Sequence, residues 1–126
     1  MDQQQITQLG DELYEALTAG KTVSPLTSRG FDITIEDAYH IQQRMLARRI
    51  EKGEKVVGKK IGVTSKAVQD MLGVFQPDFG QLTSGMVFQE GDAIDLGQLI
   101  QPKAEVELAF VLKEDLVGPG VTAADV

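Results

Sequence analysis

The stretch AEVELAFVL, residues 104–112, sets the expectation for the fold and for the chemistry of this sequence. Successive side chains of a β-strand point to opposite faces, so its alternating pattern predicts a strand. Glu105 and Glu107 share one face, about 7 Å apart along the chain, and Ala109 and Val111 continue it. The apolar side chains of the other face are Ala104, Val106, Leu108, Phe110 and Leu112.

The two carboxylates of this predicted strand allow two interpretations. Neighbouring buried carboxylates repel and lose solvation, so they need a partner that neutralises them. A divalent Mg²⁺ or Mn²⁺ is such a partner, because hard cations take carboxylate oxygens. The alternative is a strand whose Glu positions face water, as an antiparallel sheet allows. The apolar residues Ala109 and Val111 on the same face favour a pocket with an apolar floor.

Composition limits the class of protein. The chain has 126 residues, 42% hydrophobic, which is enough for one domain with a core. It has no cysteine, which excludes disulfides, thiolate nucleophiles and Cys-zinc sites. The net charge of −7 argues against a nucleic-acid partner. The polar start is unlike a signal peptide, and the longest apolar run, 108–112, is too short to cross a membrane. We therefore expect a cytoplasmic protein with no membrane partner.

The first part of the chain is expected to be helical. Apolar positions at helical spacing predict a helix over 3–19, weakened by Gly10. Turn-forming residues predict a loop over 21–33. The stretch TIED, 34–37, is a near capping box and predicts a second helix that ends before Gly53.

The rest of the chain is expected to be richer in strands. The predicted elements are a strand at 55–63, a short helix at 66–72 capped by Ser65, a loop at 74–82, short strands at 86–88 and 93–96, and the strand at 104–112. The fold class is therefore α+β, with an N-terminal helical segment at 1–53 and the first part of a β-rich core at 54–126, in one domain.

The last residues, GVTAADV, carry a helix-start signal. Thr122 is followed three residues later by Asp125, another near capping box. Because no helical sequence follows, we expect a chain that stops within its fold. The alternative is an ordinary frayed terminus.

Two further residues are candidates for chemistry. Lys60 lies between Gly58 and Gly62 on one face of the predicted strand at 55–63, where a ligand can approach the backbone closely. Burial there would lower its pKa toward acid–base use; the alternative is a surface lysine of a strand with bulges. Asp78 follows Pro77, which indicates either turn chemistry or a pocket carboxylate.

Taken in order, four stretches resemble a known family. They are PLTSRGFDITIEDAYHIQ, GKKIGVTSKAVQDMLGVFQPDFGQL, LIQPKAEVELAFVL and GPGVTAADV. They are similar to the N-terminal half of the 2-oxopent-4-enoate (2-keto-4-pentenoate) hydratases, in the hydratase/decarboxylase branch of the fumarylacetoacetate hydrolase-like proteins. The resemblance implies that the mixed β core of that fold is only partly present in this chain.

The resemblance implies a metal site and an acid–base pair. Glu105 and Glu107 would ligate Mg²⁺ or Mn²⁺, and the family's third carboxylate ligand would lie beyond Val126. The family's active-site lysine and aspartate fall on Lys60 and Asp78.

Two more residues are candidates for substrate binding because they follow Lys60 closely in the sequence. Thr64 and Ser65, which follow Lys60 in its motif, would lie near the substrate.

The implied activity is that of a hydro-lyase in aromatic meta-cleavage catabolism. It hydrates 2-hydroxypenta-2,4-dienoate to 4-hydroxy-2-oxopentanoate, a small-molecule substrate and product. A homo-oligomer, and a complex with other enzymes of the pathway, are the implied partners.

Two alternatives remain at this stage. One is 4-oxalocrotonate decarboxylase of the same family, which would need a cation for a second substrate carboxylate; Arg29 and Lys103 are the candidates. The other is a non-catalytic half-domain that binds a partner subunit.

Overall fold

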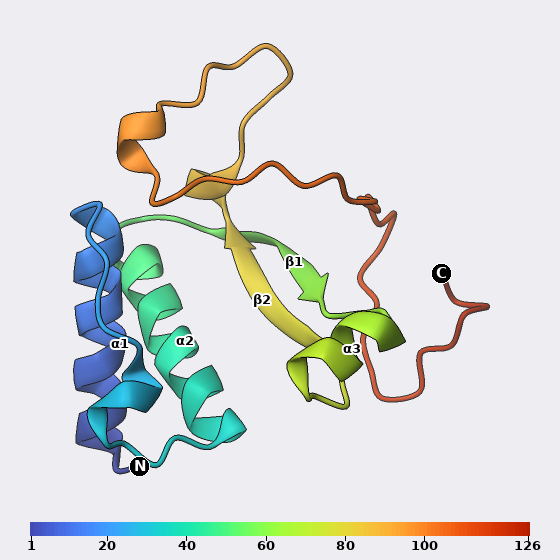
Figure 1. Ribbon diagram of the computed structural model, residues 1–126. Coiled ribbons are helices and arrows are strands. Elements are labelled where there is room, and N and C mark those ends of the chain that lie inside the picture. Colours follow the sequence, from blue (N-terminus) through green and yellow to red (C-terminus); the bar gives the residue numbers. More distant parts are fainter.

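The computed structural model describes all 126 residues. Its helices and strands are α1 (Gln3–Thr18), α2 (Ile35–Glu51), β1 (Val56–Gly62), α3 (Lys66–Leu72) and β2 (Asp78–Thr83), and short 3-10 turns cover Leu26–Arg29, Ser84–Met86 and Leu96–Gln98. Figure 1 shows the two long helices packed side by side, with the two-stranded sheet next to α2. The expected α+β class is confirmed. No helix is both long enough and apolar enough to cross a membrane.

The helical pair α1 and α2 contains the buried core. Because apolar residues recur at helical spacing, each helix presents one stripe to the other. Ile6 and Leu9 of α1 meet Ile41 of α2, and all three are buried. The partly buried side chains packed against them are Met1, Leu13, Leu26 and Phe31.

Both long helices begin with a capping box. The Asp2 carboxylate accepts a hydrogen bond from the Gln5 N–H at 2.8 Å, and the Thr34 hydroxyl accepts one from the Asp37 N–H at 3.1 Å. The Asp37 carboxylate in turn accepts bonds from the Thr34 N–H and hydroxyl, and from the Met1 ammonium. These contacts, the Thr34 N–H first, lower the pKa of Asp37 to about 2. The predicted cap at Thr34 is therefore confirmed.

Gly10, expected to weaken α1, lies at a close contact between α1 and α2. A Cβ at this position would lie 2.5 Å from the Arg44 Cβ and 3.0 Å from the Ile41 carbonyl oxygen. The lost helix propensity is therefore offset by closer packing of α1 against α2.

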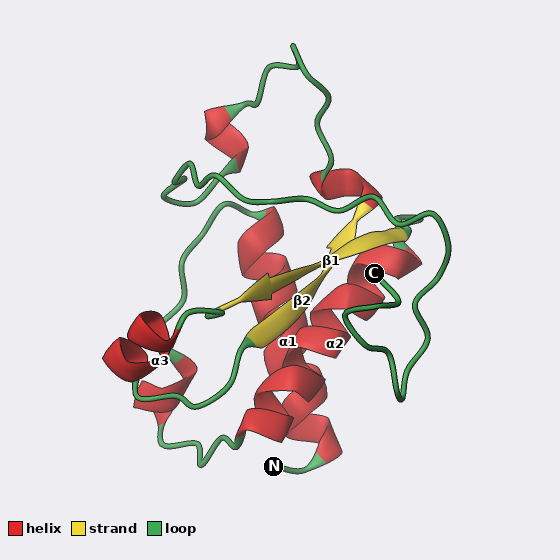
Figure 2. Ribbon diagram, turned by 90° about the vertical axis from the view of Figure 1, so that its right-hand side faces the viewer, coloured by secondary structure: helices red, strands yellow, loops and turns green.

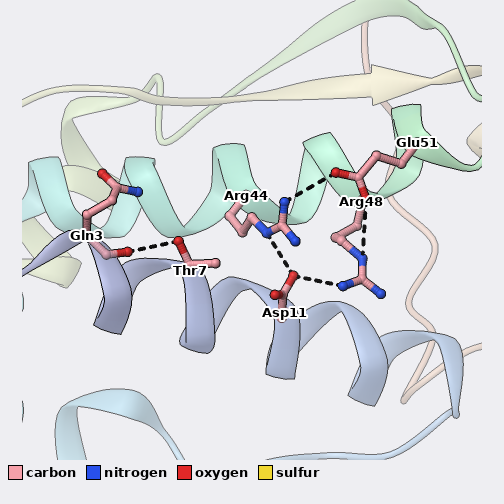
Figure 3. Close-up of polar contacts among 6 residues, drawn as sticks. All are labelled: Gln3, Thr7, Asp11, Arg44, Arg48 and Glu51. Carbon is pink, nitrogen blue, oxygen red and sulfur yellow. Dashed lines mark hydrogen bonds and ion pairs between the residues drawn. The ribbon is translucent and has the colours of Figure 1, made fainter.

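Ion pairs among mostly half-buried side chains connect the same two helices (Figure 3). Asp11 of α1 accepts hydrogen bonds from Arg44 at 2.8 Å and from Arg48 at 3.1 Å. Glu51 accepts a further bond from Arg44 at 3.3 Å and forms an ion pair with Arg48 at 3.8 Å. Because each member has more than one partner, the network fixes the register of α1 on α2 better than isolated surface pairs would.

The sheet consists of β1 and β2 in antiparallel pairing, with an irregularity between Val56 and Gly58. Immediately after β1, Val63 has φ 55°, which is rare for a β-branched residue. The Gln69 side chain of α3 donates a hydrogen bond to the Val63 carbonyl at 2.9 Å. The chain thus turns sharply from the end of β1 into α3.

The short helix α3 has its predicted boundaries. The Ser65 hydroxyl accepts a hydrogen bond from the Val68 N–H at 3.2 Å, and Gly73 ends the helix with φ 68°.

The far end of β2 is joined to the end of α2. Thr83, which is fully buried, donates a hydrogen bond to the Glu54 carboxylate, which also pairs with Arg49 at 3.1 Å. The Thr83 bond is the main cause of the lowered pKa of Glu54. These contacts fix the sheet relative to the helical pair.

Three strand predictions are wrong, and one predicted loop is a strand. The expected loop at 74–82 contains most of β2, because its backbone pairs with β1. The expected strands at 86–88 and 93–96 are coil with a 3-10 turn at each site. The stretch 104–112 is extended coil without ladder hydrogen bonds, and Figure 2 shows most of the chain after β2 as loop. A strand needs a neighbour for its backbone groups, and this stretch has none.

Near the C-terminus, Thr122 and Asp125 form half of the predicted capping box, because the Thr122 hydroxyl accepts a hydrogen bond from the Ala124 N–H at 3.3 Å and not from the Asp125 N–H. The Thr122 N–H and hydroxyl both donate to the Asp125 carboxylate at 2.7 Å. Residues 123–124 form a turn.

Candidate active site

The register of the sheet places Lys60 and Asp78 on one face. Lys60 pairs with Gly80, and Gly62 pairs with Asp78. Paired residues of an antiparallel sheet project to the same side, and so do residues two apart on one strand, so Lys60 and Asp78 are diagonal neighbours. An ammonium and a carboxylate from distant parts of the sequence therefore lie together.

Glycines surround Lys60 on this face. Gly58 and Gly62 flank it on β1, and Gly80 is opposite on β2. With no side chains at these three positions, the backbone around Lys60 is open to a ligand.

Lys60 forms an ion pair with Glu107, which joins residues 104–112 to the sheet. The Glu107 carboxylate is the first cause of the raised pKa of Lys60, and Glu105 and Asp78 add to it. Of the two interpretations of Lys60, the structure supports the surface lysine and not the buried one with a lowered pKa, because its side chain is 47% exposed and has anionic neighbours. Lys60 carries its proton over the whole neutral range.

The predicted metal ligands are placed on exposed coil rather than on a strand. Glu105 and Glu107 are both exposed, and Glu107 is occupied by Lys60. No group of three or more His, Cys, Asp or Glu side chains is arranged as a metal cluster. The two residues nevertheless offer adjacent carboxylate oxygens, the donor type that Mg²⁺ prefers.

A cavity of about 990 Å³ lies beside Lys60 and Asp78. It is lined by residues of α2, both strands and the loop after α3, and ten of the 19 lining residues are hydrophobic. The large apolar members are Ile35, Tyr39, Leu72, Val74, Phe75, Phe79, Leu82 and Met86. The polar pair thus lies at an apolar hollow, a combination typical of a small-molecule site.

Tyr39 and Gln42 of α2 also line this cavity, and the sequence analysis did not assign them to it. The Tyr39 ring stacks on Phe79, with centroids 4.8 Å apart, and its hydroxyl accepts a hydrogen bond from the Phe79 N–H at 3.4 Å. The Gln42 amide donates to the Phe79 carbonyl at 3.4 Å. Tyr39 and Gln42 follow Ile35 by four and seven residues, so the three side chains share one face of α2. This helical spacing was the sequence signal that could have identified them.

Thr64 and Ser65 do not line the cavity. The Ser65 hydroxyl caps α3, and Thr64 is exposed. The structure brings only their neighbour Val63 to the cavity wall.

The two cations considered for a second substrate carboxylate also lie outside the cavity lining. Arg29 donates to both carboxylate oxygens of Glu12 at 2.9 Å and to the Ser24 carbonyl. Lys103 is exposed. Lys60 is the only cationic side chain that lines the cavity.

Curated relatives match nearly the whole chain. A 2-hydroxypent-2,4-dienoate hydratase of Pseudomonas putida is 65% identical over 100% of this chain and 57% of its own length. A 2-hydroxyhexa-2,4-dienoate hydratase of Comamonas testosteroni is 57% identical, over 99% and 48%. A 2-keto-4-pentenoate hydratase of Paraburkholderia xenovorans is 46% identical, over 92% and 43%. The chain thus spans about half the length of the curated relatives it matches. No family model matches the chain.

Solved structures agree with the sequence matches. The 4-oxalocrotonate decarboxylase of Pseudomonas putida G7, complexed with magnesium and adipate, matches with a TM-score of 0.76 and 28% identity. The match covers 79% of this chain and 38% of the decarboxylase chain. The same enzyme complexed with calcium and acetate matches equally well.

Proposed function

This chain is homologous over nearly its whole length to the 2-keto-4-pentenoate hydratases, and we propose that it forms part of such a hydro-lyase. The substrate would be 2-hydroxypenta-2,4-dienoate and the product 4-hydroxy-2-oxopentanoate. The observation that carries this proposal is the placement of Lys60 and Asp78 on one face of the sheet, beside an apolar cavity.

The reaction requires proton transfers at separate carbon and oxygen atoms. The 2-hydroxyl loses a proton and C5 gains one, which gives a conjugated enone. Water then adds its oxygen to C4, and C3 gains a proton. A protonated Lys60 is suited to attract the substrate anion or to donate a proton, and the Asp78 carboxylate is suited to accept one. The apolar lining would surround the hydrocarbon part of the substrate.

A divalent metal fits the donor chemistry of Glu105 and Glu107. Mg²⁺ is commonly bound through one or two carboxylates, with water or substrate as the other ligands. When bound, it would chelate the substrate carboxylate and 2-oxygen and stabilise negative charge there. Mg²⁺ is our first choice, because a similar solved enzyme is described in complex with magnesium; Mn²⁺ is the alternative.

Decarboxylation of a 2-oxo dicarboxylate is the second candidate, because the matching solved structures are 4-oxalocrotonate decarboxylases. A second substrate carboxylate would need another cation in the cavity. Arg29 is occupied by Glu12 and lies outside the lining, as does Lys103. This distribution of charge favours the substrate with one carboxylate.

The remaining features of the proposal concern the setting of the enzyme. We place it in the cytoplasm, in aromatic meta-cleavage catabolism, as a homo-oligomer that associates with other enzymes of that pathway. A half-domain that only binds a partner subunit is the non-catalytic alternative.

The decisive experiment is an assay of the protein purified from the cells that make it. With Mg²⁺ present, we expect it to convert 2-hydroxypenta-2,4-dienoate to 4-hydroxy-2-oxopentanoate, and to release no CO₂ from 4-oxalocrotonate. Lys60→Gln and Asp78→Asn should each reduce kcat by about 10²- to 10⁴-fold. Lys59→Gln is the matched control, because Lys59 is the next residue of β1 and projects to the opposite face.

Three results would contradict the proposal. CO₂ release without hydration would favour the decarboxylase. No turnover of either compound would favour the non-catalytic half-domain. Undiminished rates in the Lys60 and Asp78 variants would remove the acid–base assignment.

A further inference from the structure

Gly62 lies directly opposite Asp78 in the ladder, and the Asp78 carboxylate lies over its Cα atom. A Cβ placed on Gly62 would overlap the Asp78 Oδ1. It would also lie 3.5 Å from the Asp78 Cγ and 3.9 Å from Oδ2. The space that a side chain at position 62 would occupy is therefore filled by the carboxylate.

The backbone does not explain why residue 62 is glycine. Six glycines of this chain have positive φ, the conformation that favours glycine, and Gly62 is not one of them. An alanine would therefore be accepted by the main chain. Only the position of the Asp78 carboxylate conflicts with it.

The other two glycines around Lys60 differ from Gly62. A Cβ at Gly58 would meet only the Leu82 Cδ1 at 3.8 Å, and one at Gly80 only the Gln42 Nε2 at 3.6 Å. Both distances are ordinary contacts. Of the three glycines on this face, Gly62 alone admits a charged group to the space above the backbone.

We propose that Gly62 is a positioning residue, which admits the Asp78 carboxylate to the face of the sheet that carries Lys60. This inference rests on the proposed function, in which Asp78 moves a proton. A side chain at position 62 would push the carboxylate away from Lys60 and from the cavity. Its effect on the reaction would act entirely through Asp78.

A double-mutant cycle tests this inference in the protein as the cell makes it. Gly62→Ala should lower kcat for the dienoate by about 10²-fold, the scale of a misplaced catalytic group, with a smaller change in KM. Lys59→Ala is the control on the same strand, because Lys59 projects to the opposite face and lies outside the cavity lining, and its kcat should stay within about twofold of wild type. In an Asp78→Ala background, adding Gly62→Ala should cause no further loss.

A second cycle measures the contact without the reaction. Gly62→Ala should lower the thermal midpoint of unfolding when Asp78 is present and leave it unchanged in the Asp78→Ala background. If the two substitutions are additive in both cycles, or if Gly62→Ala equals Lys59→Ala in kcat, the inference is overturned. If the wild-type protein has no hydratase activity, the proposed function fails, and the unfolding cycle alone decides whether Gly62 and Asp78 are coupled.

Discussion

The helical pair and the segment at 104–112 both carry apolar faces, and these faces have opposite environments. Leu9 of α1 is 3% exposed, whereas Leu108 is 89% exposed and its neighbours Val106 and Val111 are nearly fully exposed. The helices satisfy their backbone groups internally and need only one another to bury their apolar faces. The segment at 104–112 alternates like a strand but has no backbone partner. An apolar stretch of sequence is therefore buried only where the chain provides a second surface for it to pack against.

The same contrast separates stability from function. The helical pair contains the core and the ion-pair network, while the segment at 104–112 contributes Glu107 to the candidate site. We therefore expect substitutions in α1 and α2 to change mainly the free energy of unfolding. Polar substitutions at 104–112 should change mainly activity.

Among the substitutions that test this comparison of the helical pair with the segment at 104–112, Glu107→Gln has the largest expected effect. Glu107→Gln removes a proposed metal ligand and the ion-pair partner of Lys60, so Mg²⁺-dependent hydratase turnover should fall by about 10²- to 10³-fold. Steady-state kinetics with Mg²⁺ titration would measure this. Glu114→Gln, an exposed carboxylate further along the same coil, is the control and should retain activity. Undiminished turnover in Glu107→Gln would remove the metal assignment.

A pair of identical truncations tests the burial contrast directly. Leu9→Ala should lower the free energy of unfolding by about 2–5 kcal/mol, because it leaves a cavity between α1 and α2. Leu108→Ala should change it by less than about 0.5 kcal/mol. Denaturant unfolding of both variants gives the comparison. A large loss in Leu108→Ala would show that the segment at 104–112 is covered in solution.

Gly10→Ala should lower the free energy of unfolding by less than Leu9→Ala does. This destabilisation is the reverse of the usual effect of the substitution in a helix. Glycine to alanine in a helix ordinarily stabilises by about 1 kcal/mol. Here the new Cβ would lie 2.5 Å from the Arg44 Cβ, so we expect a loss of about 1–3 kcal/mol in the free energy of unfolding. A gain in stability, measured by denaturant titration, would contradict the close approach of the two helices.

The smallest expected effect is a pH dependence at the start of α2. The folded pKa of Asp37 is about 2, below its ordinary value of 3.8, so its charged form stabilises the folded state. That contribution is fully present above about pH 4 and is lost as the pH falls from 3.8 to 2. The stability difference between wild type and Asp37→Asn should therefore shrink over this window. Asp32→Asn, at an exposed site just before α2, serves as control.

Local signals explain which parts of the fold were predictable. The caps at Thr34 and Ser65 and the glycine stop at Gly73 depend on residues a few positions away, and the structure confirms all three. In β2, Pro77 and Asp78 resemble a turn, and the strand exists only because its backbone pairs with β1. The interactions that decide a strand are distant in sequence, so its local pattern is insufficient.

The residues of the candidate site also differ in whether local sequence signals could predict them. Motifs identified Lys60 and Asp78, and the register then placed them together. Tyr39 and Gln42 were missed because helical periodicity marks a second face without saying what lies opposite. The sequence left open whether Lys60 is buried or at the surface, because the flanking glycines indicate open backbone and say nothing about solvent; in the structure Lys60 is half-exposed.

Val63 offers a starting point for engineering this chain. Its left-handed backbone costs a β-branched residue about 1–2 kcal/mol relative to glycine. A designer who wanted a more heat-resistant protein would replace Val63 with Gly or Asn first. Because Val63 lines the cavity, the same change would also alter the shape of the binding site. Under the proposed function, thermal tolerance and substrate selectivity would therefore be linked at this residue and would have to be selected together.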